Sequence, residues 1–179
     1  MVFGKGEVAP DVEEDVQDVS FTFAVTDPAL WSAEQPNLYE TEIALLRDGA
    51  LVERTGLKVG LRRFELKGRQ MLLNGQRIVF KGVNRHEWSC RTGRTVSREE
   101  MLWDVKNLKA HNVNAVRTSH YPQSQYFLDE CDRRGLLVFT ELPGWQHIGD
   151  ESWQAQALQN CREMVCQCRN HPSVFLWGV

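Results

Sequence analysis

The chain has 179 residues, of which 42% are hydrophobic and 25% are charged, as is typical of a globular protein with one or two domains. The net charge of −3 argues against nucleic acid as a partner, and no segment approaches the roughly 20 apolar residues of a membrane span. The N-terminus also lacks the order of basic, apolar and small residues that marks a signal peptide, so we expect a cytoplasmic protein.

The first part of the chain has the pattern of a β-sheet that follows an acidic lead-in. Residues 1–18 contain few large apolar side chains and many acidic ones, and we expect a solvated loop there. Apolar and polar residues then alternate over 21–25 and 39–45, and Asp48-Gly49 predicts a hairpin turn. Residues 1–63 are therefore predicted to be the C-terminal part of an immunoglobulin-like β-sandwich, with about four strands where the whole fold needs about seven.

After this region the pattern changes from β to alternating β and α. Asn74-Gly75 predicts a second hairpin. Apolar runs then recur between segments of helical periodicity, and this spacing predicts parallel strands joined by crossover helices. The predicted strands are residues 78–83, 113–116, 136–139 and 174–177. Residues 64–179 are therefore expected to form an α/β unit of four strands and three helices.

The first two predicted helices carry clear start or stop signals. The first begins with a capping box, in which Ser97 is followed by Glu100. The second is predicted to begin near Pro122. Gly135 ends it, because glycine adopts the left-handed conformation most easily.

Cysteines mark the third predicted helix, which ends at Asn170. The five cysteines of the chain are an odd number without paired zinc-type spacing, so we expect reduced thiols. Cys161 and Cys168 fall on the apolar face of the helix, and core packing is therefore favoured over a metal or redox role.

Polar, ionisable or aromatic side chains follow the first three parallel strands. Because the carboxyl ends of parallel strands meet at one edge of a sheet or barrel, we expect these residues to share one site. One histidine by itself would indicate little, but several histidines beside an arginine favour a site over unrelated surface loops. The residues are Asn84, His86 and Glu87 after the first strand, Arg117 and His120 after the second, and Glu141, Trp145 and His147 after the third.

At these residues the chain resembles glycoside hydrolase family 2, the family of β-galactosidases and β-glucuronidases. The similar stretches are residues 114–122 (the family signature), 82–87 (its first barrel strand and loop), 30–39 (its sandwich domain) and 170–174 (the segment before its fourth strand). Arg85 after Asn84 is more similar to the β-galactosidase branch than to the glucuronidase branch, where a lysine is usual.

The resemblance implies a multidomain β and α/β protein, in which a partial immunoglobulin-like sandwich precedes the first half of a (β/α)8 TIM barrel. It also implies a retaining mechanism with two glutamates about 5–5.5 Å apart. In the family, the acid/base glutamate lies a few residues after the position of Trp177, and the nucleophile lies on a later strand. Both are expected beyond Val179, so we expect the isolated chain to be inactive. The full-length protein is expected to be a homo-oligomer that acts on a β-galactoside or related carbohydrate without a cofactor.

The resemblance also assigns roles to individual residues. His86 and His120 would donate hydrogen bonds to hydroxyls of the non-reducing sugar, and Arg117 would keep the nucleophile ionised. Asn84 and Glu141 would brace these residues, and a purely structural role fits these two equally well.

The loop after the third strand departs from the metal-dependent members of the family. Those members hold magnesium with a glutamate where this chain has Trp145, and His147 by itself is a poor ligand for an ion that prefers oxygen. We therefore expect no metal site. Trp145 would instead offer an aromatic face to a sugar, and a core position is an equal alternative.

Other functional classes stay open from the sequence. A noncatalytic sugar-binding module would keep the histidines and aromatic residues. A metal hydrolase would use His86, Glu87, His120 and His147, but the chain has no His-Glu-x-x-His helix. A purely structural or vestigial fragment is a further alternative, because half a barrel leaves two strand edges open.

Overall fold

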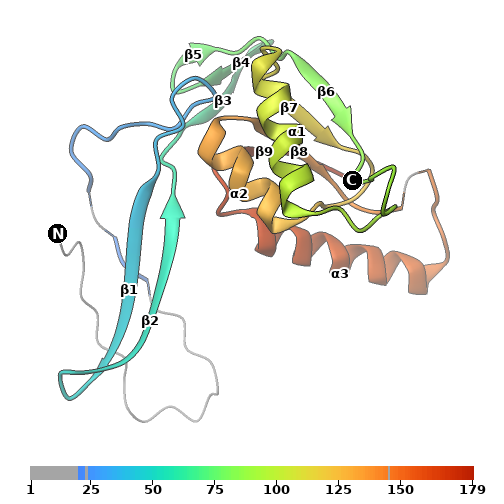
Figure 1. Cartoon of the computed structure of the whole chain (residues 1–179). Helices are drawn as coiled ribbons and strands as arrows, with labels where there is room; N and C mark the ends of the chain where they lie inside the picture. The colour runs from blue at the N-terminus through green and yellow to red at the C-terminus, as the bar shows by residue number, and fades with distance from the viewer. Residues whose placement is uncertain (1–19, 23, 145) are drawn as a thin grey trace.

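The computed structural model describes residues 20–22, 24–144 and 146–179. Strands β1 and β2 form one sheet, β3 to β5 a second, and β6 to β9 a third (Figure 1). In chain order the elements are β1 (Tyr39–Arg47), β2 (Ala50–Val59), β3 (Phe64–Lys67), β4 (Gln70–Leu73), β5 (Gln76–Arg77), β6 (Gly82–Arg85), α1 (Arg98–Ala110), β7 (Ala115–Thr118), α2 (Gln125–Arg134), β8 (Leu137–Glu141), α3 (Glu151–Cys168) and β9 (Val174–Gly178).

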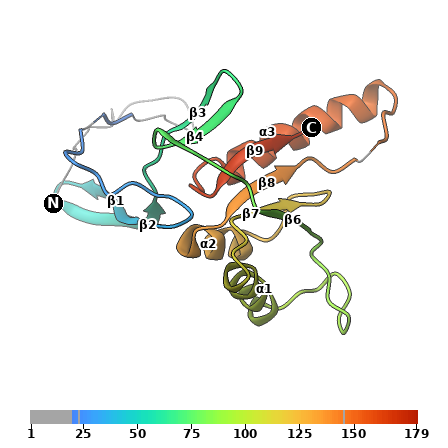
Figure 2. The same cartoon turned by 90° about the horizontal axis from the view of Figure 1, so that it is seen from above.

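Strands β1 and β2 form an antiparallel ribbon that extends away from the parallel sheet (Figures 1 and 2). Its turn lies at Asp48 and Gly49, whose φ angles of 51° and 79° suit the predicted two-residue hairpin. Most side chains of the ribbon are exposed, so the ribbon has little core of its own.

The described residues contain fewer sandwich strands than the sequence predicts. The alternation at 21–25 was expected to be a strand, but residues 20–22 and 24–25 are irregular, and Phe21 is 48% exposed. A strand needs a hydrogen-bonding neighbour, and no described strand pairs with this segment. The acidic lead-in at 1–18 and Phe23 lie outside the described residues.

The second predicted hairpin is confirmed, although its last strand is short. Asn74 and Gly75 have φ angles of 54° and 79°, and Leu73 pairs with Gln76 across the turn. Strand β3 adds to the other side of β4 through a turn at Gly68, which also has a positive φ of 61°.

The parallel sheet confirms the predicted alternation of strands and helices, but its first strand begins later than predicted. β6 begins at Gly82, because the side chain of Asn114 holds the preceding segment in place of a neighbouring strand. The Asn114 amide donates to the Val79 carbonyl (2.9 Å) and accepts from the Lys81 N–H (2.8 Å).

The second parallel strand also begins later than predicted. β7 begins at Ala115 instead of residue 113, since the N–H of Val113 still donates to the Leu108 carbonyl at the end of α1. Arg117 therefore lies inside β7 and not beyond its end. Strands β8 and β9 lie where the sequence predicts them, with small changes at their ends.

The helix signals are mostly confirmed. Ser97 and Glu100 form the complete capping box of α1, and Gly135 ends α2 with a φ of 73°. α2 was predicted to begin near Pro122 and begins at Gln125, because Ser124 is the N-cap. The Ser124 hydroxyl accepts from the N–H of Tyr126, and a proline side chain has no such acceptor.

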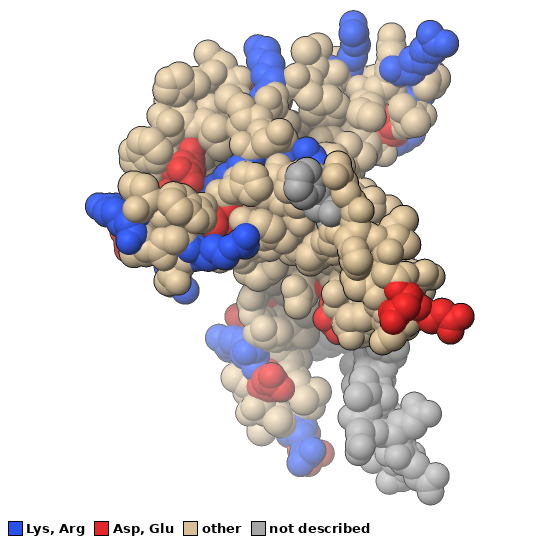
Figure 3. Space-filling view, turned by 90° about the vertical axis from the view of Figure 1, so that its right-hand side faces the viewer, with Lys and Arg blue, Asp and Glu red and all other residues tan. Residues whose placement is uncertain are grey.

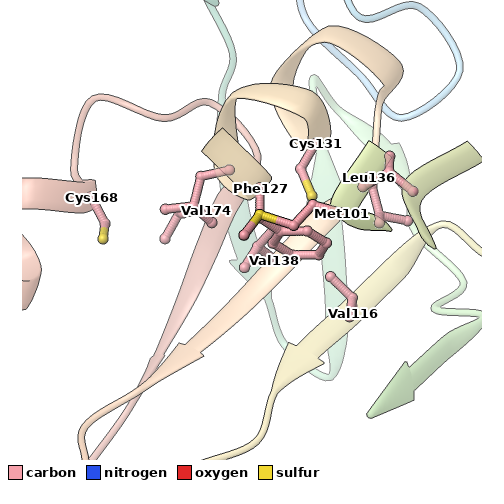
Figure 4. Close-up of a cluster of buried hydrophobic side chains, with 10 residues drawn as sticks. Met101, Val116, Phe127, Cys131, Leu136, Val138, Cys168 and Val174 are labelled. Carbon is pink, nitrogen blue, oxygen red and sulfur yellow. The ribbon is translucent and has the colours of Figure 1, made fainter. Parts of the chain in front are cut away.

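The main core lies between one face of the parallel sheet and the three helices (Figure 4). Side chains alternate between the two faces of a strand, and Val116, Val138 and Val174 lie on the helix side. The buried residues of this core are Met101, Val105, Val116, Phe127, Leu128, Cys131, Leu136, Val138, Cys168 and Val174. On the other face, Ala115 and Leu137 pack with Trp31, Ala33 and Leu73.

All five cysteines are free thiols. Cys168 is buried in the core, as predicted, whereas Cys161 is only half-buried. Burial also raises the pKa of the Cys131 thiol well above its ordinary value, which keeps the thiol protonated and unreactive.

No helix in the described part of the chain is long and apolar enough to cross a bilayer. On the face shown in Figure 3, basic and acidic side chains are interspersed on a mainly uncharged surface.

Candidate active site

The candidate site lies at the carboxyl edge of the parallel sheet. Asn84 of β6 is level with Arg117 of β7, which is level with Phe139 of β8. By strand alternation, Asn84, Arg117 and Glu141 belong to the face opposite the helices, the same face as Ala115. The strand ends therefore bring these three residues to one side of the sheet.

Arg117, His120 and Glu141 form a connected cluster. The Arg117 Nε donates a charge-assisted hydrogen bond to Glu141 Oε1, and His120 Nδ1 lies 3.1 Å from Glu141 Oε2. The Glu141 side chain is only 11% exposed, against 36% for Arg117. A carboxylate with both oxygens bound in this way is fixed in position.

The proton on the His120 ring can be assigned from its neighbours. Nδ1 also lies 3.4 Å from Arg117 Nη2, but the Glu141 carboxylate is closer and can only accept. We therefore place a proton on Nδ1, donating to Glu141. The remaining Nε2 accepts a hydrogen bond when the ring is neutral and donates one when it is protonated.

His86 lies beside this cluster, in the loop after β6. Its ring meets the His120 ring edge-on, with centroids 5.6 Å apart. The two loops are also tied together through Glu87, whose N–H donates to the Tyr121 hydroxyl (3.0 Å) and whose carboxylate accepts from the Ser124 N–H (3.2 Å). The peptide bond between Ser119 and His120 is cis.

A buried polar network on the helix side supports these loops, and sequence reasoning missed it. Arg85 lies over the Phe127 ring, at 4.2 Å from its centroid, and its Nε donates to Asp104 of α1 (2.9 Å). Gln123 accepts from the Arg85 guanidinium and donates to the Arg85 carbonyl (2.8 Å). The carbonyl also accepts from Ser119 N–H (3.0 Å), so the positions of the two loops are linked. The one signal in the sequence was Arg85 itself, because alternation along the strand places this arginine on the side that faces the core.

The loop after β8 contributes less among the described residues. Trp145 lies outside them. His147 is exposed, and its ring packs edge-on against Trp153 at 5.3 Å between centroids. Over the ranges 20–22, 24–144 and 146–179, the one set of three potential metal ligands close enough to share an ion is Asp129, Asp132 and His171. His86, Glu87, His120 and His147 do not form such a set there.

The geometry suits a polyhydroxylated ligand. A fixed carboxylate, a guanidinium and two imidazole rings offer hydrogen-bond donors and acceptors along one edge of the sheet. Arg117 offsets the charge of Glu141, so a neutral ligand meets no uncompensated carboxylate.

Comparisons with known proteins give a consistent assignment. Residues 64–179 match the family model of glycosyl hydrolases family 2, TIM barrel domain, and residues 4–62 match that of glycosyl hydrolases family 2. The β-galactosidase of Streptococcus thermophilus is 45% identical over 164 residues, covering 83% of this chain and 16% of that protein. The β-galactosidase of Lactobacillus delbrueckii subsp. bulgaricus is 40% identical over 180 residues, covering 91% of this chain and 18% of that protein.

Solved structures show the same similarity. The β-glucuronidase of Parabacteroides merdae matches with a TM-score of 0.80 at 31% identity, over 86% of this chain and 19% of that chain. β-Glucuronidase 3 of Bacteroides uniformis matches with a TM-score of 0.79 at 36% identity, over 86% of this chain and 20% of that chain. The chain thus spans 16–20% of the length of these relatives.

Proposed function

Because the chain belongs to glycoside hydrolase family 2, we propose that it is part of a retaining β-galactosidase. The curated relatives at 40% and 45% identity are β-galactosidases. The solved β-glucuronidases are 31% and 36% identical, so β-glucuronidase is the second candidate. In this proposal, residues 1–63 are the end of a sandwich domain and residues 64–179 are the first half of the catalytic barrel.

The observation that carries the proposal is the cluster of Arg117, His120 and Glu141 at the carboxyl edge of the parallel sheet, where barrel enzymes bind their substrates. His120 and His86 would bind hydroxyls of the non-reducing galactose. Glu141 would orient His120 by accepting from its Nδ1, and Asn84 would brace Arg117 from the neighbouring strand. Trp145 would offer an aromatic face to the sugar.

The chemistry of a retaining glycosidase explains why these residues would matter. The sugar ring flattens and gains positive charge in the transition state, and hydrogen bonds to its hydroxyls strengthen as it does so. Arg117 would favour the ionised form of a nearby nucleophilic carboxylate. The two glutamates that break the bond would follow Trp177 in the longer protein, so the 179-residue chain would bind without hydrolysing.

The test is to extend the reading frame beyond codon 179, express the complete protein and assay it with an aryl β-galactoside and the matching β-glucuronide. We expect the galactoside to be the better substrate. His120→Ala should lower kcat/KM about 10- to 100-fold, since a hydrogen bond to a charged group contributes about 1.5–3 kcal/mol. His111→Ala is the matched control, because His111 is exposed and its ring bonds only the Asn107 carbonyl among the contacts described.

Preference for the glucuronide would move the assignment to the second candidate. Equal losses in the His120 and His111 variants would remove His120 from the site. Turnover by the rigorously pure 179-residue chain, abolished by His120→Ala, would contradict the expected position of the catalytic glutamates.

A further inference from the structure

The segment 170–174 has no part in the site, yet it makes a dense set of polar contacts. It links α3 to β9, and the side chain of its second residue, His171, is 12% exposed. The His171 Nδ1 lies 2.6 Å from Asp132 Oδ2, and Nε2 lies 2.9 Å from Gln125 Oε1. Both neighbours belong to α2, so the ring is bound at both nitrogens to one helix.

The neighbours of the ring determine its charge. A carboxylate can only accept hydrogen bonds, and so can the amide oxygen of Gln125. The Gln125 nitrogen is directed at the sulfur of Cys168 (3.9 Å), which supports this orientation of the amide. A neutral imidazole has one N–H and can satisfy only one of two acceptors, whereas an imidazolium satisfies both.

Other charges around the ring agree with a cation there. Asp129 lies 4.0 Å from Nδ1. Burial lowers the pKa of His171, but the hydrogen bond and charge of Asp132, together with the charge of Asp129, outweigh burial and raise the pKa above its ordinary value.

The charged groups of the adjoining elements have partners of their own, and Arg133 pairs with Glu130. The concavity beside His171 is lined by Arg133 of α2 and by Glu40, Glu42 and Lys58 of the ribbon. Lys58 lies 3.8 Å from Glu40, and Glu42 pairs with Arg54 at 3.5 Å. Arg62 donates to the carbonyls of Pro172 and Val174, and its charge acts on Asp132.

The same contacts fix the start of β9. Asp132 Oδ1 accepts from the N–H of Ser173 (2.9 Å), and the Ser173 carbonyl accepts from the N–H of Val138 in β8 (2.8 Å). Asp132 also holds the first part of the chain, because its carbonyl accepts from the indole N–H of Trp31 (2.8 Å). Asp132 of α2 is therefore bonded to two separate segments, residues 170–174 and the loop that carries Trp31, and Ser173 links the first of these to β8.

We propose that His171 is a positively charged clasp, held between Asp132 and Gln125, that positions strand β9 against helix α2. Helix α2 (residues 125–134) follows the loop that carries His120 in the sequence. By binding β9 to α2, the clasp therefore also fixes the position of β9 relative to that loop. Its importance for catalysis rests on the proposed function, in which the acid/base glutamate follows β9. The clasp itself does not depend on any sugar chemistry.

The sign of the pH dependence follows from the raised pKa. The stabilisation is fully present below the pKa of the unfolded chain, about 6.5 for histidine, and is lost as pH rises through the higher pKa of the folded state. Raising the pH through the folded-state pKa of His171 should therefore loosen the start of β9.

The experiment is NMR of the 179-residue chain with nitrogen-15 in its histidine rings, titrated from acid to alkaline pH. We expect both His171 nitrogens to stay protonated above pH of about 6.5. Asp132→Asn should lower the His171 midpoint and should flatten the loss of stability with rising pH. Asp129→Asn is the milder variant if Asp132→Asn does not fold, and it should lower the midpoint by less. His111→Gln is the control, and it should leave the His171 titration and the β9 amide signals unchanged.

A His171 ring with a single proton near pH of about 6.5 would overturn the proposal. So would a His171 midpoint that neither aspartate variant moves. A change in the His171 nitrogen signals on adding micromolar zinc would show a metal site formed with Asp129 and Asp132 instead. Because no sugar or turnover enters these measurements, they can fail or succeed independently of the proposed function.

Discussion

Arg117 and Glu141 form an ion pair that is largely shielded from solvent on the Glu141 side. Arg117→Ala would leave the Glu141 carboxylate, which is 11% exposed, without its cationic partner. We expect a loss of about 1–3 kcal/mol in the free energy of unfolding, measured by urea denaturation.

The ribbon offers a matched control for this charge pair. Arg54 lies 3.5 Å from Glu42, and both side chains are more than half exposed. Arg54→Ala should change stability by less than about 1 kcal/mol. Equal losses in the two variants would mean that the burial of Glu141 does not matter.

Glu100 gives a pH-dependent prediction at the start of α1. The N–H of Ser97, the Ser89 hydroxyl and the Arg91 guanidinium lower the pKa of Glu100 from 4.5 to about 2. The stabilisation is therefore present above pH 4.5 and is lost as pH falls toward 2. The protection of the amides in the first turn of α1 against hydrogen exchange, relative to an unfolded chain, should fall over this window.

Glu100→Gln should make the protection of the first turn of α1 independent of pH over this window. Glu163→Gln is the control, because Glu163 bonds only the Gln159 side chain among the contacts described. If the first turn of α1 stays protected down to pH 2, the capping carboxylate does not hold it.

At the scale of single residues, the sequence predicted that Arg117, His120 and Glu141 would lie together, but not all of the residues that hold the surrounding loops in place. Arg117, His120 and Glu141 come together because they lie at or just beyond the carboxyl ends of the neighbouring strands β7 and β8, which apolar runs reveal. Their role in binding substrate stays a prediction. Asp104 and Gln123 were not predicted, since a helix-surface aspartate and a loop glutamine look the same whether or not a buried arginine reaches them.

At the scale of elements, Gly135 has the most restrictive position. It ends α2 with a φ of 73°, and a Cβ there would lie 2.2 Å from the Ala33 carbonyl oxygen. Gly135→Ala should therefore lose at least about 3 kcal/mol, from left-handed strain plus displacement of backbone. Thermal unfolding monitored by circular dichroism would measure the loss.

Gly49 is a control that separates the left-handed strain from the displacement of backbone. Its φ is 79°, but no atom lies within 4 Å of an added Cβ, so Gly49→Ala should lose only about 1–2 kcal/mol. Similar losses in both variants would show that the close approach of Ala33 to α2 is unimportant.

Helix ends and hairpin turns could be predicted from sequence because each depends on local chemistry. Asp48-Gly49, Asn74-Gly75, Ser97 and Gly135 all have the predicted roles. Strand starts could not be predicted as well. Residues 78–81 have the apolar character of a strand, but whether they pair depends on the distant side chain of Asn114.

At the scale of the whole molecule, the described residues differ strongly in burial. β7 and β8 are buried on nearly every residue, whereas most residues of β1 and β2 are exposed. Hydrogen exchange followed by mass spectrometry should therefore show slow exchange in β7 and β8 and fast exchange in the ribbon. Equal protection of both regions would indicate that another surface covers the ribbon in solution.

The parallel sheet of the described residues has β6 and β9 at its two edges. The chain corresponds to 16–20% of the length of its relatives. The sequence predicted both the α/β alternation and the open edges. It could not predict that the described residues 20–22, 24 and 25 pair with no strand, because alternation shows which residues suit a strand and not whether a neighbour is present.

The hydrogen bonds of Asn114 have a consequence for how this gene can change. Arg117 faces away from the helices because it lies an odd number of positions after Asn114, and the Asn114 side chain fixes that count by holding Val79 and Lys81. A single codon inserted between Asn114 and Ala115 would turn Arg117 toward the helices and bring Val116 to the opposite face. A substitution in this strand changes one side chain, but a one-codon insertion would exchange the two faces in a single step.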